Sequence, residues 1–390
     1  MISKIKALAK THTARIVEIR RHLHRHPELS FIEHKTAEYV KAVLDDLGIA
    51  YKDGLGSGTG ITGVIGQGDT TIALRADMDA LPIQEESTVE YRSVNDGVMH
   101  ACGHDVHTAS LLGSLMILKS LEQDLKHKVK FIFQPGEEQL PGGASMMIAD
   151  GALQNPKVAQ IYGQHVHPSL PVGKIGYHPG FFMASCDELF ITVIGQGGHG
   201  AMPQETIDPI MISAELIQSL QTIVSRNANP NTPSVLSIGK INSDGGATNV
   251  IPARVMMEGT FRTFDEDWRK EAHKLIERRI THIVESYGAQ VELEIKKGYP
   301  SLYNDPDMTH RARDLMRQYM GDDHVVELPQ RMTAEDFSYY SQVVPACFYR
   351  LGTASEDGSN SSPVHTPTFD IDEGALEISS GLMAWLAMHK

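Results

Sequence analysis

A cysteine and three histidines lie close together between residues 99 and 110, which read MHACGHDVHTAS. Thiolate and imidazole are ligands that zinc and similar divalent ions prefer. The same two residue types can also make a nucleophile and its base, here Cys102 with His107. The stretch alone does not decide between a metal site and a thiol nucleophile, because either needs partners from elsewhere in the fold.

More residues of this kind follow the segments that we expect to be β-strands. In an open parallel sheet, functional groups gather just beyond the carboxyl ends of the strands. Strands expected at 71–77, 129–134, 159–166 and 346–352 end in, or lead through a loop to, candidate ligands and bases: Asp79, Glu137 and Glu138, His165 and His167, and His365. A thiol nucleophile would leave most of these without a role, so a metal site is favoured.

The number and the types of these residues indicate two ions and a base. Five or more ligands are more than one tetrahedral zinc ion uses, and a thiolate or carboxylate could bridge a pair of ions. Glu137 and Glu138 are adjacent, so their side chains point in different directions. One of them can therefore bind metal while the other faces the water as a general base.

Alternating strands and helices predict the fold that carries these residues. Helices are expected at 4–25, at 33–47, after HDVHTA up to about residue 125, and from about residue 372. With the four strands above, they indicate an α/β domain whose mixed, mostly parallel sheet is flanked by helices.

Residues 183–296 follow a different pattern. Strands are expected at 187–195, 234–242, 253–261 and 289–297, with one helix after the first strand and another at 266–287. The order βαββαβ is the ferredoxin-like unit. We therefore expect a catalytic domain made of 1–182 and 297–390, interrupted by an inserted domain at 183–296.

Composition excludes several classes of protein. The chain has 390 residues and a net charge of -14, which argues against a nucleic-acid binder. No apolar run approaches the roughly 20 residues of a membrane helix, and the start lacks a signal-peptide core, so a cytoplasmic protein is expected. Three cysteines make no disulfide framework, and Cys186 and Cys347 are expected to be core thiols.

Nine motifs occur in order over nearly the whole chain: HLHRHPELSFIEHKT, RADMDALPIQEES, MHACGHDVHTA, FQPGEEQLPGGA, GQHVHPSLPVG, GQGGHGAMP, TNVIPARVMMEGTFRT, AEDFSYY and VHTPTFDIDE. On these motifs the chain resembles the M20 metallopeptidase family. Within it, the chain is most similar to the amidohydrolase branch of aminoacylases, hippurate hydrolases, N-acetyl-diaminopimelate deacetylases and auxin-conjugate hydrolases.

The resemblance implies metal-dependent hydrolysis of the amide bond of N-acyl amino acids, with two divalent ions (Zn, Mn, Ni or Co) in each subunit. The ligands that it implies are Cys102, His104, Glu138, His165 and His365. Glu137 would be the general base, and Asp79 would orient the metal site.

The resemblance also gives the inserted domain a role as lid and dimerisation domain. His199, Asn249 and Arg262 match positions that bind the substrate's carboxylate and polarise the scissile carbonyl. Family members commonly form homodimers through this domain, and the histidine often reaches the partner subunit's active site. Gly200 and Gln204 depart from the family pattern, which bears on substrate preference.

Several alternatives stay open at this point. His107 competes with His104, and His167 with His165, although the motifs favour His104 and His165. A dipeptidase or carboxypeptidase of the same family would share the chemistry. An inactive metal-binding scaffold is disfavoured because the base and all five ligands are present. The acyl group, the preferred amino acid and the native metal are not determined by the sequence.

Overall fold

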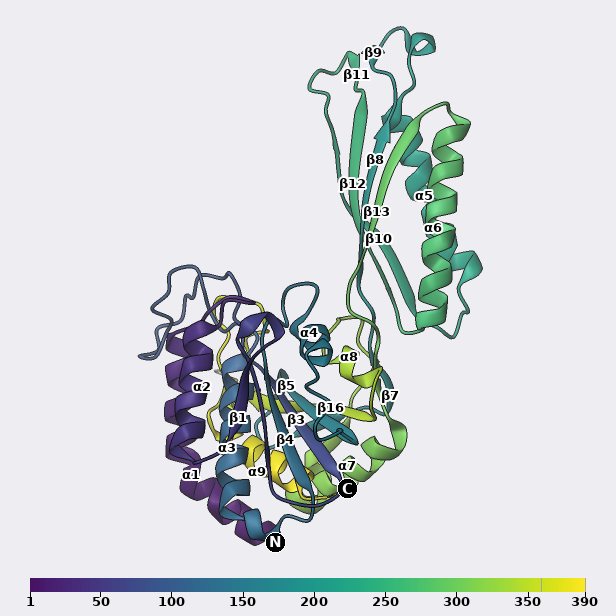
Figure 1. Cartoon of the computed structure of the whole chain (residues 1–390). Helices are drawn as coiled ribbons and strands as arrows, with labels where there is room; N and C mark the ends of the chain where they lie inside the picture. Colours follow the sequence, from purple (N-terminus) through teal and green to yellow (C-terminus); the bar gives the residue numbers. More distant parts are fainter. Residues whose placement is uncertain (359, 390) are drawn as a thin grey trace. The chain divides into compact units, whose positions relative to one another are not determined.

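The computed structural model describes residues 1–358 and 360–389, and these form two compact units (Figure 1). Unit 1 comprises Met1–Phe182, Tyr303–Gln330 and the chain from Asp336 onward, and unit 2 comprises Met183–Leu302 and Arg331–Glu335. No helix in the described residues is long and apolar enough to cross a membrane.

Unit 1 is built on one large sheet of eight strands within the described residues. In spatial order these are β1 (Tyr51–Leu55), β2 (Gly60–Ile65), β4 (Lys128–Gln134), β3 (Thr71–Asp77), β5 (Gln160–Pro171), β16 (Ala346–Ala354), β6 (Ile175–Tyr177) and β15 (Val325–Glu327). The four central strands, β4, β3, β5 and β16, are parallel to one another. The strands β1, β2 and β6 join antiparallel. The prediction of a mixed, mostly parallel sheet is confirmed.

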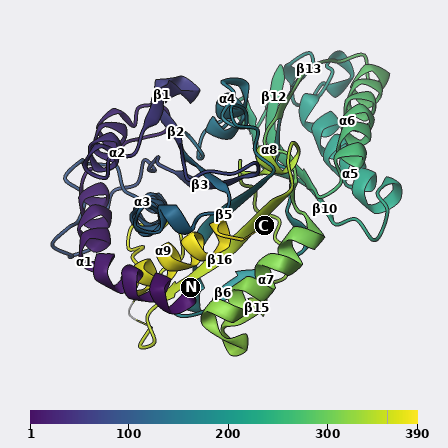
Figure 2. The ribbon, with the colours of Figure 1, turned by 60° about the horizontal axis from the view of Figure 1, so that its bottom comes forward.

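Helices flank this sheet (Figure 2). They are α1 (Ile2–Arg25), α2 (His34–Asp46), α3 (His104–Ser120), α4 (Gly143–Ala149), α7 (Pro306–Met320), α8 (Ser338–Ser341) and α9 (Gly374–Ala387). Helix α3 is buried from His104 to Leu118 and packs against α1 and α9. From Thr108 to Leu118 its residues are apolar or small on every side, which is typical of a core helix. A Cβ atom at Gly113 would come within 2.4 Å of Ser380 and 2.6 Å of Ile16, so the glycine lets α3 pack closely against α9 and α1.

Unit 2 has the expected ferredoxin-like order. Strand β8 (Asp187–Ile194), helix α5 (Pro209–Asn227), strands β10 (Ser234–Ser243) and β12 (Arg254–Thr263), helix α6 (Glu266–Ser286) and strand β13 (Gln290–Lys297) follow one another. The antiparallel sheet has the order β10-β12-β8-β13. Alternate residues of β8 are buried on one face, where α5 and α6 lie side by side (Figure 1). A short pair, β9 (Gly198–His199) with β11 (Val250–Ile251), extends from this unit.

Unit 2 begins at residue 183 and extends to Leu302 rather than to 296. The extra residues are held within the unit, because Tyr299 O accepts from the Cys186 N–H at 3.1 Å and the Ser301 N–H donates to Glu266 at 2.7 Å. Strands β7 (Gly180–Met183) and β14 (Leu302–Asn304) pair where the chain leaves and re-enters unit 1.

Candidate metal centre

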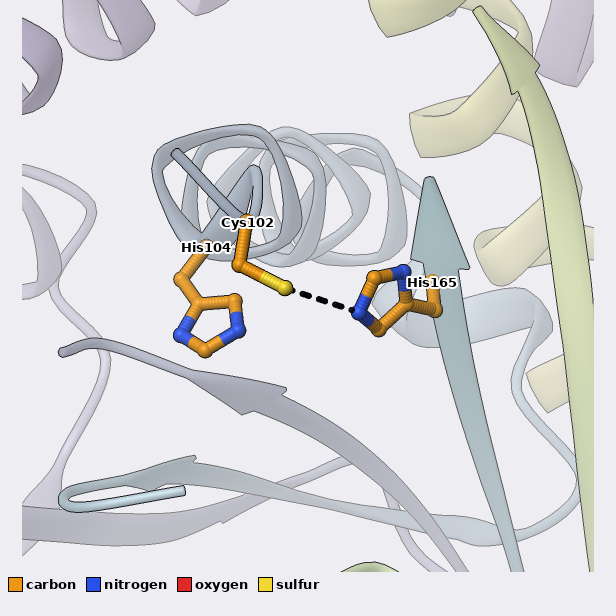
Figure 3. Close-up of side chains that lie close together, drawn as sticks. All are labelled: Cys102, His104 and His165. Carbon is orange, nitrogen blue, oxygen red and sulfur yellow. Dashed lines mark hydrogen bonds between the residues drawn. The ribbon is translucent and has the colours of Figure 1, made fainter. Parts of the chain in front are cut away.

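The start of α3 holds two of the predicted ligands, Cys102 and His104. They flank Gly103, whose φ of 78° lies in the left-handed region that glycine adopts without strain. A Cβ atom at Gly103 would come within 2.6 Å of Val166 Cγ2, so this turn lies directly against β5. As a result, Cys102 Sγ lies 3.3 Å from Nε2 of His165, which β5 carries (Figure 3).

Cys102 also contacts the loop that precedes α9. Nε2 of His365 lies 3.3 Å from Cys102 Sγ and 3.1 Å from Glu138 Oε1. The φ of His365 is 63°, a left-handed conformation that costs a non-glycine residue about 1–2 kcal/mol. Its N–H donates to Ala101 O at 2.7 Å, which holds it in place. Backbone strain of this kind collects at functional sites.

Two groups of potential ligands share Cys102. The ligand atoms of Cys102, His104 and His165 all lie within 4.8 Å of one another, and so do those of Cys102, Glu138 and His365. One sulfur common to two triads is the arrangement that a thiolate-bridged pair of ions needs. The first triad is buried, whereas the second reaches solvent through His365, whose side chain is 51% exposed.

The hydrogen bonds of His104 leave one ring nitrogen for a metal. Nδ1 lies 3.1 Å from Asp79 Oδ1 and donates to it, whereas Nε2 is buried and has no hydrogen-bond partner in the described part of the chain. A buried polar atom without a partner is costly. A divalent cation bound by this nitrogen and Cys102 would satisfy it, so the residues present fit such an ion. His165 is oriented similarly, since its Nδ1 donates to Val166 O at 2.8 Å.

The electrostatics of the centre also suit a cation. Burial raises the pKa of the Cys102 thiol far above its usual value, and the charges of Glu138 and Glu137 raise it further. Burial lowers the pKa of His104, but the carboxylates of Asp77 and Asp79 outweigh it and raise this pKa to about 10. The neighbouring carboxylates contribute to both shifts, and a divalent ion would offset their negative charge while deprotonating the thiol.

The two glutamates that follow β4 have different neighbours. Glu138 belongs to the second triad, and its N–H donates to Asp79 Oδ2 at 2.9 Å. Glu137 is 6% exposed; its Oε2 lies 3.9 Å from His104 Nε2, and its Oε1 accepts from the Asp336 N–H at 3.4 Å. Glu137 therefore borders the triads that share Cys102 without belonging to either, a position that suits a general base.

The alternative histidines lie differently. His107 Nδ1 lies 2.6 Å from Asp77 Oδ1, and its Nε2 accepts from the Val166 N–H at 3.0 Å. Both ring nitrogens of His107 therefore take part in hydrogen bonds, and His107 also lies in a group with Asp77 and His104 whose ligand atoms are all within 4.8 Å of one another. Among the described residues, His167 belongs to no group that could hold a metal, whereas His165 does.

The three predicted substrate-binding residues all lie in unit 2, but not together. His199 pairs with Val250, and the Gly200 N–H donates to Asn249 O at 2.7 Å, so His199 and Asn249 are neighbours in exposed chain. Arg262 lies near the other end of the sheet, in β12, and donates to Met332 O at 3.1 Å. From Arg254 to Arg262 the strand spans about 26 Å, at ~3.3 Å per residue.

Sequence reasoning missed three side chains that make hydrogen bonds around this centre: Asp77, Ser30 and Glu33. Asp77 binds His107, Ser30 donates to Asp79 Oδ2 at 2.6 Å, and Glu33 accepts from the Gly136 N–H at 2.8 Å. Asp77 could have been found, because it ends the strand that precedes Asp79. Ser30 and Glu33 stand in the motif HPELSFIEH, but nothing in the spacing indicates what they contact.

Comparisons with known proteins give matches over most of the chain. Residues 73–389 match the model of the peptidase family M20/M25/M40. An N-acyl-L-amino acid amidohydrolase of Geobacillus stearothermophilus is 44% identical over 77% of this chain and 81% of its own length. A thermostable carboxypeptidase of Saccharolobus solfataricus is 38% identical over 100% of this chain and 98% of its own.

A solved structure gives the same result for the fold. A dinuclear metal-binding peptidase of Bacillus subtilis superposes with a TM-score of 0.83 at 36% identity, covering 97% of this chain and 98% of that one. The similarity therefore extends over both units and includes a protein whose site holds two metals.

Proposed function

This chain belongs to the peptidase family M20/M25/M40, and from that premise we propose that it is a metal-dependent hydrolase that cleaves the amide bond of N-acyl amino acids. The observation that carries the proposal is the pair of ligand triads that share Cys102, with Glu137 beside them. The similarity to an N-acyl-L-amino acid amidohydrolase supports the substrate class.

We assign one ion to Cys102, His104 and His165, and a second to Cys102, Glu138 and His365. Zinc, manganese, nickel and cobalt all suit a mixed thiolate, imidazole and carboxylate set. When bound, such ions lower the pKa of a water molecule toward neutrality and polarise an acyl oxygen.

The chain's own residues then carry the proton. Glu137 takes a proton from the attacking water and later passes it to the departing amine, so that one carboxylate is first base and then acid. Burial of Glu137 at 6% exposure excludes bulk water from this transfer. Asp79 accepts from His104 Nδ1 and from the Glu138 N–H, and so fixes the imidazole tautomer and the direction of the glutamate pair.

Arg262 would hold the free carboxylate of the substrate, and His199 would donate to the scissile carbonyl, with Asn249 beside it. One subunit cannot place His199 and Arg262 on the same small molecule, because β12, about 26 Å long from Arg254 to Arg262, lies between Arg262 and the β9–β11 pair that carries His199. We therefore propose a homodimer through unit 2, in which His199 serves the partner subunit. A net charge of -14 supports small molecules rather than nucleic acid as the substrates.

A carboxypeptidase or dipeptidase is the second candidate, because a full-length relative at 38% identity is a carboxypeptidase. Both reactions use the same metals, base and carboxylate recognition. They differ in whether an acyl group or an amino acid lies on the far side of the scissile bond.

One screen tests these proposals together. The purified chain is loaded separately with each of the four metals, and amine release is measured from N-acetyl-methionine, hippurate and a panel of dipeptides. We expect N-acyl amino acids to be hydrolysed, and a chelator to abolish the reaction. Faster turnover of dipeptides would favour the second candidate. Absence of hydrolysis with every metal would refute the assignment.

A further inference from the structure

A buried carboxylate from the N-terminal part of the chain reaches the turn that carries the glutamate pair. Glu33 is 0% exposed. Its Oε1 accepts from the Gly136 N–H at 2.8 Å and from the Phe31 N–H at 2.8 Å, and its Oε2 accepts from the Thr59 hydroxyl at 2.8 Å. A carboxylate buried to this extent with three donors is held in one position.

The Glu33 side chain does not serve the helix that it precedes. Glu33 is the N-cap residue of α2, yet its side chain makes no capping hydrogen bond. Glu28 instead accepts from the Thr36 N–H at 2.9 Å and the Thr36 hydroxyl at 3.0 Å. The Glu33 carboxylate is therefore directed at the turn around Gly136, and Glu28 provides a comparison residue within the same segment.

The turn itself is packed tightly against this segment. Gly136 has a φ of 59°, and a Cβ atom there would lie 2.1 Å from the ring of Phe31. Phe31 has a φ of 69°, which is strained for a phenylalanine. The Phe31 N–H donates to the same Glu33 oxygen as the Gly136 N–H, so one acceptor fixes both sides of the contact.

The residues on both sides of Glu137, Gly136 and Glu138, thus each donate a backbone hydrogen bond to a buried carboxylate. Glu33 accepts from Gly136, and Asp79 accepts from Glu138 at 2.9 Å. We propose that Glu33 is a positioning residue for Glu137: it fixes the Pro135–Gly136 peptide, one residue before the base, and so sets the direction of the base's side chain. Glu33 touches no reacting atom, and the proposal rests on the role proposed above for Glu137.

Two substitutions of Glu33 separate the effect of its side-chain length from the effect of its negative charge. Glu33→Gln keeps an oxygen for the two N–H groups, and its NH2 can donate to Thr59, so the geometry is retained without the charge. Glu33→Asp keeps the charge but withdraws the acceptor from Gly136 by one carbon–carbon bond, ~1.5 Å. Glu28→Asp makes the same shortening beside Thr36 and is the matched control.

The experiment measures kcat, KM and bound metal for the three variants with an N-acyl amino acid. We expect Glu33→Asp to lower kcat by about 10- to 100-fold with KM and metal content unchanged. Glu33→Gln and Glu28→Asp should stay within about threefold of wild type, because each keeps the Gly136 N–H bonded. Three results would each overturn the proposal: a Glu33→Asp variant that keeps its kcat, a Glu33→Gln variant that falls as far, or a Glu28→Asp variant that falls equally.

A second readout does not depend on catalysis. Amide hydrogen exchange of a peptide covering residues 134–142 is measured in the metal-free chain. Exchange should be faster than wild type in Glu33→Asp and unchanged in Glu33→Gln and Glu28→Asp; equal rates in all four proteins would sink the proposal. If the wild type hydrolyses no N-acyl amino acid, the proposed function fails. The exchange measurement still decides whether Glu33 stabilises the turn around Gly136.

Discussion

Substitution of Gly103 by alanine tests how the first ligand triad is assembled. The added Cβ atom would meet Val166 Cγ2 at 2.6 Å and Cγ1 at 3.0 Å, in backbone with a φ of 78°. The left-handed conformation costs alanine about 1–2 kcal/mol, and overpacking adds about 1–3 kcal/mol. Because the Val166 side chain is branched at Cβ and buried, we expect the turn to relax by moving Cys102 and His104 away from β5, which carries His165.

We therefore expect Gly103→Ala to weaken metal binding as well as stability. If about 2 kcal/mol of the strain is relieved by opening the triad, the metal dissociation constant rises about 30-fold. Metal titration of the apo chain measures this constant, and urea unfolding measures the free energy that the fold loses.

Val166→Ala provides the control, because it removes both methyl groups that the new Cβ atom would meet. The double variant should recover the overpacking part of the loss but not the part due to backbone strain. A coupling energy of about 1 kcal/mol or more between the two positions is expected in this cycle. The reasoning is refuted if Gly103→Ala binds metal as tightly as wild type, or if Val166→Ala restores nothing.

Three further predictions concern the base, the carboxylate and the fold of unit 2. Glu137→Gln should keep its metals and lose about 10²- to 10⁴-fold in kcat; a comparable rate would remove Glu137 from the mechanism. Arg262→Ala should raise KM strongly for substrates with a free carboxylate and little for amidated ones, and equal effects would mean that Arg262 does not read that group. Burial raises the pKa of Asp187, but hydrogen bonds from Arg269 and His273 outweigh burial and lower it, so the ionised form stabilises the fold above about pH 4 and less below it. The unfolding free energy of wild type should therefore fall as the pH drops from about 5 to 3, and fall less in Asp187→Asn, as denaturant titrations at each pH would show.

The sequence predicted those helices and strands whose apolar residues recur at the spacing of a helix or a strand. Strand 71–77 is found at those residues, and the order βαββαβ in unit 2 follows from alternation and helical spacing that each element shows by itself. The extension of unit 2 to Leu302 could not be predicted from the sequence, because it depends on the hydrogen bonds that Tyr299 accepts from Cys186 and that Ser301 donates to Glu266. Such contacts join positions far apart in sequence, and no local pattern reports them.

For the candidate site too, the sequence predicted some residues, whereas other contacts became known only from the structure. Strand ends indicated Glu137, Glu138 and His165, because the carboxyl edge of a parallel sheet is a place that topology defines. The choice between His104 and His107 depended on which ring nitrogens the protein itself uses, and only the contacts to Asp79, Asp77 and Val166 reveal that. The contact of Glu33 with Gly136 was hidden for the same reason, since the two residues are 103 positions apart.

The sheet of unit 2 sets the distance between Arg262, near one end of β12, and the β9–β11 pair that carries His199. A β-strand hardly stretches, and a change of one residue turns every following side chain to the opposite face. Unless a bulge takes up an extra residue, as between Ile238 and Lys240 of β10, the separation changes in steps of two residues, ~7 Å each. Because β12 is paired with β10 and β8, and β8 with β13, such a step changes the pairing with the neighbouring strands as well. The distance that this sheet sets between Arg262 and His199 is consequently a feature of the molecule that single substitutions cannot alter.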